Sequence, residues 1–270
     1  MSGRAIMASR EERQRLAVVI GGGNGIGEAT ALLMAERGWR LAVCDKDGAA
    51  AAHVAAAVGG ESFALDIGQA QSVDGVAVRI DETLGPVAAL VVAAAIFQDV
   101  LPPADLPMEV WDRSLQINLT GTYLANRAFG MRMARQGAGS IVNIASIASL
   151  GSFPVHAYAA TKRAVVSLTE GLAGEWGRSG VRVNAVSPGS TLVPRVVERL
   201  KSGRYAAHPG DFTALGRAVE PNEVAEAIEF LASDRASAIT GVNLVVDCGW
   251  EVASTWAQYG GVRPAVREGG

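Results

Sequence analysis

Near the start of the chain lies the stretch LAVVIGGGNGIG, residues 16–27. Its first five residues are apolar and mostly β-branched, which is typical of a strand buried on both faces of a parallel sheet. The glycines that follow allow a tight turn and let the backbone approach a pyrophosphate, whose charge would face the N-terminus of the next helix. A purely structural turn would look similar, but a strand before the loop and a helix after it favour dinucleotide binding.

Six further apolar runs continue this pattern, at residues 40–44, 62–65, 88–92, 140–144, 181–186 and 243–246. Helical segments lie between them: residues 72–84 and the segment that begins at Pro221 carry apolar side chains at helical spacing. Strands that alternate with helices predict right-handed crossovers and a parallel sheet. We therefore expect an α/β protein with a doubly wound, Rossmann-like sheet of seven parallel strands and helices on both faces.

The 270 residues contain no linker, repeat or low-complexity block that would divide the chain. With 49% hydrophobic and 19% charged residues, the composition is typical of a folded protein. We expect a flexible N-terminal extension over residues 1–15 and a single dinucleotide-binding and catalytic domain over residues 16–250. Residues 251–270 are expected to form a tail that either meets a neighbouring subunit or packs on its own, since Trp256 and Tyr259 carry large apolar surfaces.

The net charge of the chain is −3, from 24 basic and 27 acidic side chains. This balance gives no electrostatic reason to expect nucleic acid or an anionic membrane as a partner. No stretch approaches the ~20 apolar residues that span a bilayer, and the N-terminus lacks the pattern of a signal peptide. Two distant thiols, Cys44 and Cys248, predict neither a disulfide framework nor a metal site. We therefore expect a soluble cytoplasmic protein.

Asp45 directly follows the second apolar run. An acidic side chain at this place can accept hydrogen bonds from both hydroxyls of an adenosine ribose. Asp45 could instead cap the next helix, although Asp47 is equally well placed for that role. Facing the ribose, Asp45 would repel a 2′-phosphate at ~4 Å by ~4 kcal/mol at an effective dielectric of ~20, before solvent screening. The sequence therefore favours NAD over NADP, although the neighbouring Lys46 would soften the repulsion.

Tyr158 and Lys162 stand four residues apart in a helical segment predicted over residues 156–176. The spacing places both on one helix face, and a lysine cation lowers the pKa of a phenol from its usual ~10. Ser146 follows the fifth apolar run, where its hydroxyl can hold a substrate oxygen while Tyr158 transfers the proton. Asn118 interrupts a helical stretch and can hold a water. Alternatively, Ser146 is only a turn residue, and Asn118 is a buried amide whose hydrogen bonds are all made with the backbone.

These residues together resemble the short-chain dehydrogenase/reductase family in its compact single-domain form, over almost the whole chain. Residues 21–27 are similar to its TGxxxGIG loop, and Asn118, Ser146, Tyr158 and Lys162 match its catalytic tetrad. The resemblance implies that Lys162 holds the nicotinamide ribose as well as tuning Tyr158. It also implies that Lys162, Asn118 and water form the proton exit, and that the protein is a homotetramer.

The resemblance further implies where NAD binds. Asp66 and Ile67 resemble the pair that contacts the adenine in this family. Pro188 and Gly189 resemble the turn beside the nicotinamide carboxamide, and Thr191 resembles a hydroxyl that anchors the carboxamide. The full set of expected cofactor-binding residues is Gly21, Asn24, Gly25, Ile26, Gly27, Asp45, Lys46, Asp66, Ile67, Ala93, Ala94, Ala95, Tyr158, Lys162, Pro188, Gly189 and Thr191.

Two positions depart from the family pattern. Ile20 stands where the family has threonine, and residues 92–95 read Val-Ala-Ala-Ala in place of Asn-Asn-Ala-Gly. The lost side chains usually support the loops by hydrogen bonds, so weaker local stability is expected near the cofactor. Every group in direct contact with the chemistry is retained, and activity is therefore still expected.

The substrate is expected to be a small-molecule alcohol or ketone, held by Phe97, Ser146, His156 and Tyr158. By family likeness, Ile96, Ser149, Phe153 and residues 190–215 complete the pocket. His156 is equally consistent with a helix cap or an exposed side chain. The basic side chains Arg195, Arg199, Lys201 and Arg204 either recognise an anionic or hydroxyl-rich substrate or form the solvated face of a mobile lid.

The leading hypothesis is therefore an NAD-dependent oxidoreductase that transfers a hydride between the cofactor and a secondary alcohol or its ketone. A polyol, a sugar or a cyclic alcohol is the expected substrate. The alternatives are a 3-oxoacyl thioester reductase and a non-catalytic dinucleotide-binding protein on the same fold.

Overall fold

Seven parallel strands form one sheet in the computed structural model, which describes residues 15–203 and 207–264. The order across the sheet is β3-β2-β1-β4-β5-β6-β7, and all six pairings are parallel. The strands are β1 (Leu16–Ile20), β2 (Arg40–Asp45), β3 (Glu61–Ala64), β4 (Val87–Val92), β5 (Gly139–Ile144), β6 (Val181–Pro188) and β7 (Asn243–Val246). The predicted sheet is confirmed, with strand ends displaced by at most two residues.

The strand order reverses beside β1, because β2 and β3 lie on one side of it and β4 to β7 on the other. Ile20 at the end of β1 pairs with Cys44 of β2 and with Val92 of β4, so these strands end at the same level. Ligands of doubly wound sheets bind in the crevice that such a reversal leaves beyond the carboxyl ends of the strands. The loops after β1, β2 and β4 therefore surround the expected binding site.

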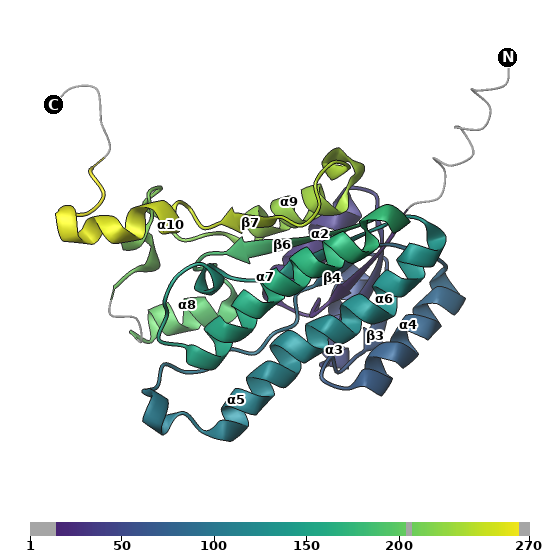
Figure 1. Ribbon diagram of the computed structural model, residues 1–270, viewed down its shortest axis with the longest axis horizontal. Coiled ribbons are helices and arrows are strands. Elements are labelled where there is room, and N and C mark those ends of the chain that lie inside the picture. The colour runs from purple at the N-terminus through teal and green to yellow at the C-terminus, as the bar shows by residue number, and fades with distance from the viewer. Residues whose placement is uncertain (1–14, 204–206, 265–270) are drawn as a thin grey trace, which may run out of the picture.

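Helices cover both faces of the sheet (Figure 1). One face carries α2 (Gly25–Glu36), α3 (Gly48–Ala57) and α9 (Pro221–Ala232), and the other carries α4 (Ala70–Leu84), α6 (Thr122–Gln136) and α7 (His156–Trp176). Three short helices lie beyond the sheet: α5 (Met108–Ser114), α8 (Pro194–Lys201) and α10 (Trp250–Ala253). Alternate side chains of each strand enter one core or the other, as Val18 and Val19 do. This arrangement confirms the predicted doubly wound fold.

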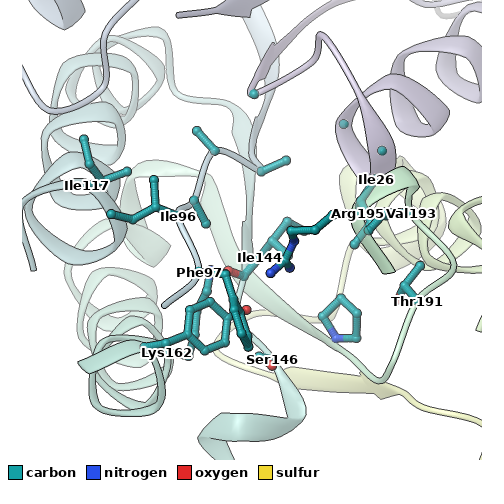
Figure 2. A pocket seen from close by; sticks show the side chains of 18 of the residues that line it. Ile26, Ile96, Phe97, Ile117, Ile144, Ser146, Lys162, Thr191, Val193 and Arg195 are labelled. Atoms are coloured by element: carbon teal, nitrogen blue, oxygen red, sulfur yellow. Dashed lines mark hydrogen bonds between the residues drawn. The ribbon is translucent and has the colours of Figure 1, made fainter. Parts of the chain in front are cut away.

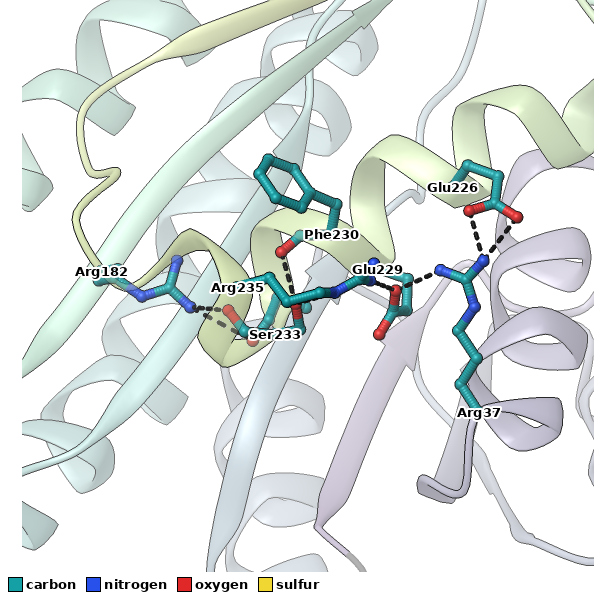
Figure 3. A network of polar contacts seen from close by, with 8 residues as sticks. Arg37, Arg182, Glu226, Glu229, Phe230, Ser233 and Arg235 are labelled. Carbon is teal, nitrogen blue, oxygen red and sulfur yellow. Dashed lines mark hydrogen bonds and ion pairs between the residues drawn. The ribbon is translucent and has the colours of Figure 1, made fainter.

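Charged side chains join α2 to α9 on the first of these faces (Figure 3). Arg37 at the end of α2 pairs with Glu226 and Glu229, and Arg235 also contacts Glu229. The Glu229 side chain is only 5% exposed, so two guanidinium groups compensate a carboxylate that is almost withdrawn from water. Arg182 of β6 donates to three carbonyl groups at the end of α9, which the helix itself leaves without partners.

The predicted N-terminal extension, residues 1–15, lies outside the described residues except for Arg15. After β7 the chain forms α10 and a 3₁₀ helix over Ser254–Tyr259, which extend away from the sheet in Figure 1. Trp256 is 48% and Tyr259 82% exposed. Within the described residues, no helix is long and apolar enough to cross a membrane, and no cluster of His, Cys, Asp or Glu could hold a metal ion.

Candidate active site

A cavity of about 1000 Å³ opens at the carboxyl edge of the sheet (Figure 2). Every residue that the sequence predicts for cofactor binding lines this cavity, from Gly21 after β1 to Thr191 after β6. Phe97 and three members of the expected tetrad, Ser146, Tyr158 and Lys162, line it as well. The fold thus brings the predicted cofactor residues and the predicted acid–base group into one space.

The glycine-rich loop has room only for glycine at its closest contacts. A Cβ at Gly27 would lie 2.0 Å from the carbonyl oxygen of Gly21, and Gly21 itself has a φ of +81°. Asn24 stands at the N-cap of α2 and makes no side-chain hydrogen bond to the helix. The first amides of α2 therefore face the cavity without a side-chain acceptor, which fits a diphosphate group at this helix end.

Backbone hydrogen bonds hold the loops at the two positions that depart from the family pattern. The carbonyl group of Ile20 accepts from the amides of Ala93 at 2.8 Å and Ala94 at 3.0 Å. The amides of Gly21 and Gly22 both donate to the carbonyl group of Cys44. Main-chain groups make these connections, so they do not depend on the missing threonine and asparagine side chains. The weaker local stability expected near the cofactor stays a prediction.

The Asp45 carboxylate lies at the cavity, held by two backbone amides. It accepts from Gly23 at 2.9 Å and from Asp47 at 3.0 Å. Asp47 caps α3 by accepting from the amides of Ala49 and Ala50. The capping role therefore belongs to Asp47, and the alternative interpretation of Asp45 as a helix cap is excluded. The remaining acceptor capacity of Asp45 is available to a ligand at this end of the cavity.

The Tyr158 phenol comes from the first turn of α7. Burial raises its pKa, while a hydrogen bond with Ser146 and the positive charge of Arg195 act in the opposite direction. Ser146 follows β5 and also accepts from the amide of Ala148 at 3.1 Å. The ring of Phe97 packs against that of Tyr158, with centroids 4.7 Å apart. A phenol and a hydroxyl group thus meet at one point of the cavity.

Lys162 lies beneath Tyr158, with its Nζ 5.6 Å from the centroid of the phenol ring, as the four-residue spacing predicts. The Nζ donates to the carbonyl oxygen of Ile144 at 2.6 Å. Burial lowers the pKa of this ammonium group from 10.5 to about 8. The groups that lower the Tyr158 pKa here are Ser146 and Arg195, whereas the sequence assigned that effect to Lys162.

Asn118 interrupts the helical stretch as predicted, within a π-helical segment over Leu115–Gly121. π-helical turns are rare and often occur at functional sites. Its buried amide exchanges two hydrogen bonds with the backbone of Ile96, at 2.8 and 2.9 Å, and lies 3.3 Å from the Thr161 hydroxyl. Asn118 does not line the cavity itself. This geometry matches the alternative interpretation of Asn118 as a buried amide that bonds to the backbone. A role of Asn118 in proton release remains a prediction.

Two residues predicted for the substrate pocket lie elsewhere. His156 is the first residue of α7, where the helix was expected to begin, but its side chain is exposed and does not line the cavity. Ser149 is buried, and its hydroxyl lies 3.3 Å from that of Ser187. Ile96 and Phe153 do line the cavity, and Phe153 packs on Trp250 with ring centroids 5.0 Å apart.

Gln98 supports the tyrosine, and sequence reasoning did not identify it. Its buried Oε1 accepts from the amides of Ala157 at 2.7 Å and Tyr158 at 3.0 Å. The glutamine therefore supplies the acceptor that the first turn of α7 lacks, because the N-cap residue Val155 has no side-chain oxygen. The partners stand 59 and 60 residues apart, so no local pattern indicates the contact.

The chain is similar in sequence to known oxidoreductases over most of its length. A family model described as enoyl-(acyl carrier protein) reductase matches residues 21–251. The chain is 37% identical over 244 residues to a D-threitol dehydrogenase of Mycolicibacterium smegmatis, covering 88% of this chain and 93% of that protein. It is 34% identical over 245 residues to an NAD-dependent glycerol dehydrogenase of Listeria innocua, covering 88% of this chain and 94% of that protein.

Solved structures with the same fold cover nearly the whole chain. One described as ribose-5-phosphate isomerase from Brucella melitensis has a TM-score of 0.91 and 48% identity, over 93% of this chain and 98% of that one. A structure described as a short-chain dehydrogenase/reductase family protein has a TM-score of 0.80 and 37% identity. The match covers 88% of this chain and 97% of that one. The structure of an NAD⁺-bound xylitol dehydrogenase has a TM-score of 0.82 and 30% identity. The match covers 87% of this chain and 98% of that one.

Replacing Gln98 by leucine should destabilise the start of α7. The change leaves two buried amides without an acceptor, so we expect the free energy of unfolding in urea to fall by about 1–3 kcal/mol. Amide hydrogen exchange should accelerate at Ala157 and Tyr158. Gln98→Glu is the matched control, because its carboxylate still accepts from both amides at a helix N-terminus. Unchanged exchange in Gln98→Leu would contradict this role.

The buried Lys162 predicts a pH-dependent stability. Below pH 8 the ammonium group is charged in both states, and folding carries the full cost of its burial. As the pH rises from about 8 toward 10.5, the folded protein loses this proton before the unfolded chain does, so the cost is relieved. Compared with Lys162→Met, the wild type should gain about 2–3 kcal/mol of unfolding free energy between pH 7 and pH 10. A pH-independent difference between the two proteins in urea titrations would refute the shift.

Proposed function

Because the chain belongs to the short-chain dehydrogenase/reductase family, we propose that it is an NAD-dependent dehydrogenase of a polyol, a sugar or a cyclic alcohol. One observation carries the proposal: a single cavity holds the glycine-rich loop and Asp45 at one end and Ser146, Tyr158 and Lys162 at the other. The related proteins described as threitol, glycerol and xylitol dehydrogenases support an alcohol substrate.

The residues present fit NAD. The first turn of α2 and the glycines before it would hold the diphosphate, and Asp45 would accept from the hydroxyls of the adenosine ribose. Asp66 and Ile67 would meet the adenine, while Pro188, Gly189 and Thr191 would lie at the nicotinamide. The relatives described as NAD-dependent glycerol dehydrogenase and NAD⁺-bound xylitol dehydrogenase support the same cofactor.

In the proposed reaction, a secondary alcohol loses two electrons and two protons in total and becomes a ketone. NAD, held by the residues named above, would supply the acceptor for the hydride that leaves the carbinol carbon. Ser146 would hold the substrate oxygen, and the Tyr158 phenolate would take the hydroxyl proton, for which its contact with Ser146 is suited. Lys162 would hold the nicotinamide ribose and pass the proton outward through Asn118 and water. Reduction of the ketone would run the same steps in reverse.

The alternatives are less well supported. A 3-oxoacyl thioester reductase usually takes NADP and a basic residue where Asp45 stands. A dinucleotide-binding protein without activity would not need Ser146, Tyr158 and Lys162 together. The structural relative described as ribose-5-phosphate isomerase raises a third possibility, which the assay below separates, because isomerisation consumes no NAD.

We extend the proposal to the quaternary structure and suggest a homotetramer. Trp256 and Tyr259 leave apolar surface exposed on a single chain, and a second copy of the tail region would cover it. Measurement of the solution mass by light scattering tests this suggestion. A monomeric mass at micromolar concentration would rule it out.

The activity is tested by following NAD reduction with polyols, sugars, cyclic alcohols and hydroxysteroids. Tyr158→Phe should lower kcat by roughly 10²–10⁴ and leave NAD affinity nearly unchanged, since only the transferable proton is removed. Tyr123→Phe is the matched control, because Tyr123 is 44% exposed on α6 and should retain full activity. A Tyr158→Phe variant with near wild-type kcat would overturn the proposed mechanism.

The cofactor preference depends on Asp45. Wild-type protein should bind NAD at least tenfold more tightly than NADP, since ~1.4 kcal/mol of repulsion is enough for that ratio. Asp45→Asn removes the charge and should narrow the ratio, chiefly by improving NADP binding. Asp47→Ser serves as control, because serine preserves the cap of α3. Equal affinities of the wild type in a fluorescence titration would contradict the assignment of Asp45 to the ribose.

A further inference from the structure

Four basic side chains line the cavity within the described residues: Lys46, Arg113, Lys162 and Arg195. Lys46 adjoins Asp45, Arg113 donates to Gln116 at 2.9 Å beside the loop after β3, and Lys162 donates to the carbonyl group of Ile144. Arg195 enters the cavity from the first turn of α8, on the side opposite α7 (Figure 2).

Arg195 lies close to the phenol through one intervening ring. Its Cζ is 4.3 Å from the centroid of the Phe97 ring, and that centroid is 4.7 Å from the centroid of Tyr158. In Figure 2 the guanidinium group reaches into the space between Val193 and Phe97, toward Ser146. Its positive charge also lowers the Tyr158 pKa, as expected of a cation near the phenol. Arg195 and the phenol thus both contact Phe97 and line the same cavity.

A second arginine, Arg199, lies one helical turn later on α8. Arg199 pairs with Asp99 at 2.7 Å, and its Cζ lies 5.4 Å from the centroid of Phe97. Arg199 does not line the cavity. This ion pair joins α8 to the loop after β4 at the surface, where the Asp99 side chain is 76% exposed, and such exposed pairs contribute little to stability. Glu198 is the acidic residue of this helix that lines the cavity, and it is exposed.

We propose that Arg195 binds an anionic group of the substrate, a carboxylate or a phosphate, while the reacting hydroxyl lies at Tyr158 and Ser146. A guanidinium group offers paired donors that match either oxyanion. The inference rests on the proposed dehydrogenase function and narrows it to acidic polyols, such as sugar acids or polyol phosphates.

The kinetic test uses threitol, threonate and threitol monophosphate at saturating NAD. Wild type should show a kcat/KM at least tenfold higher for one of the two anions than for threitol. Arg195→Gln should reduce the anion-to-neutral ratio of kcat/KM by about 10- to 100-fold. The ratio is used because any influence of Arg195 on the Tyr158 phenol affects all three substrates alike. Arg195→Lys should restore part of the ratio, since it keeps the charge but not the paired donors.

Arg199→Gln is the matched control, because it removes a guanidinium group from the same helix and the same Phe97 ring but from outside the cavity. Its anion-to-neutral ratio should stay within about threefold of the wild type. Equal loss in Arg195→Gln and Arg199→Gln, or a ratio near one in the wild type, overturns the proposal. A large fall in NAD affinity in Arg195→Gln also overturns it, because the arginine would then serve the cofactor.

A binding measurement separates this inference from the proposed function. Calorimetric titration of the NAD-loaded protein with threonate and with inorganic phosphate needs no turnover. Binding of either anion that Arg195→Gln weakens at least tenfold supports the inference even if no alcohol is oxidised. Oxidation of neutral polyols without measurable binding of either anion leaves the dehydrogenase function standing and refutes the role of Arg195.

Discussion

The contact between Gly27 and the carbonyl group of Gly21 is the constraint on which the rest of the site depends. Because a Cβ at Gly27 would lie 2.0 Å from that oxygen, β1 and α2 can be joined this closely only through glycine. The close approach turns the first amides of α2 toward the crevice between β1 and β4. The same turn brings the Gly21 and Gly22 amides onto the carbonyl group of Cys44, just before Asp45 at the end of β2.

The loop after β4 connects the two halves of the site. Its first amides bind the carbonyl group of Ile20, Ile96 pairs with Asn118, and Gln98 accepts from the first turn of α7. Phe97, between these two anchors, separates Tyr158 from Arg195. A short segment thereby sets the distance from the cofactor loop to the phenol and from the phenol to α8. This explains why the site tolerates alanines where the family pattern has asparagine and glycine.

Charges of both signs line both ends of the cavity. The end near β2 and β3 carries Asp45, Lys46, Asp66 and Arg113, and the end near α7 and α8 carries Lys162, Arg195 and Glu198. Burial raises the pKa of Tyr158 and lowers that of Lys162, so it favours the neutral form of both. Hydrogen bonds and nearby charges offset part of this cost for the phenol. The Ser146 hydrogen bond and the Arg195 charge thus reduce the cost of a phenolate at Tyr158, although burial still holds its pKa above that of a free phenol.

The sequence alone determined the sheet, the glycine-rich loop and the shared face of Tyr158 and Lys162. Strand and helix periodicities are local properties of the sequence, and buried parallel strands appear in it as continuous apolar runs. The sequence located the start of α7 but left open whether His156 faces the pocket or solvent, because the direction of a side chain in a first turn depends on what packs beside it. Only the tertiary structure identified Gln98 as the acceptor for α7 and placed Arg195 across from Tyr158. These contacts join segments that are distant along the chain, and no periodicity records a hydrogen bond between residues 59 positions apart.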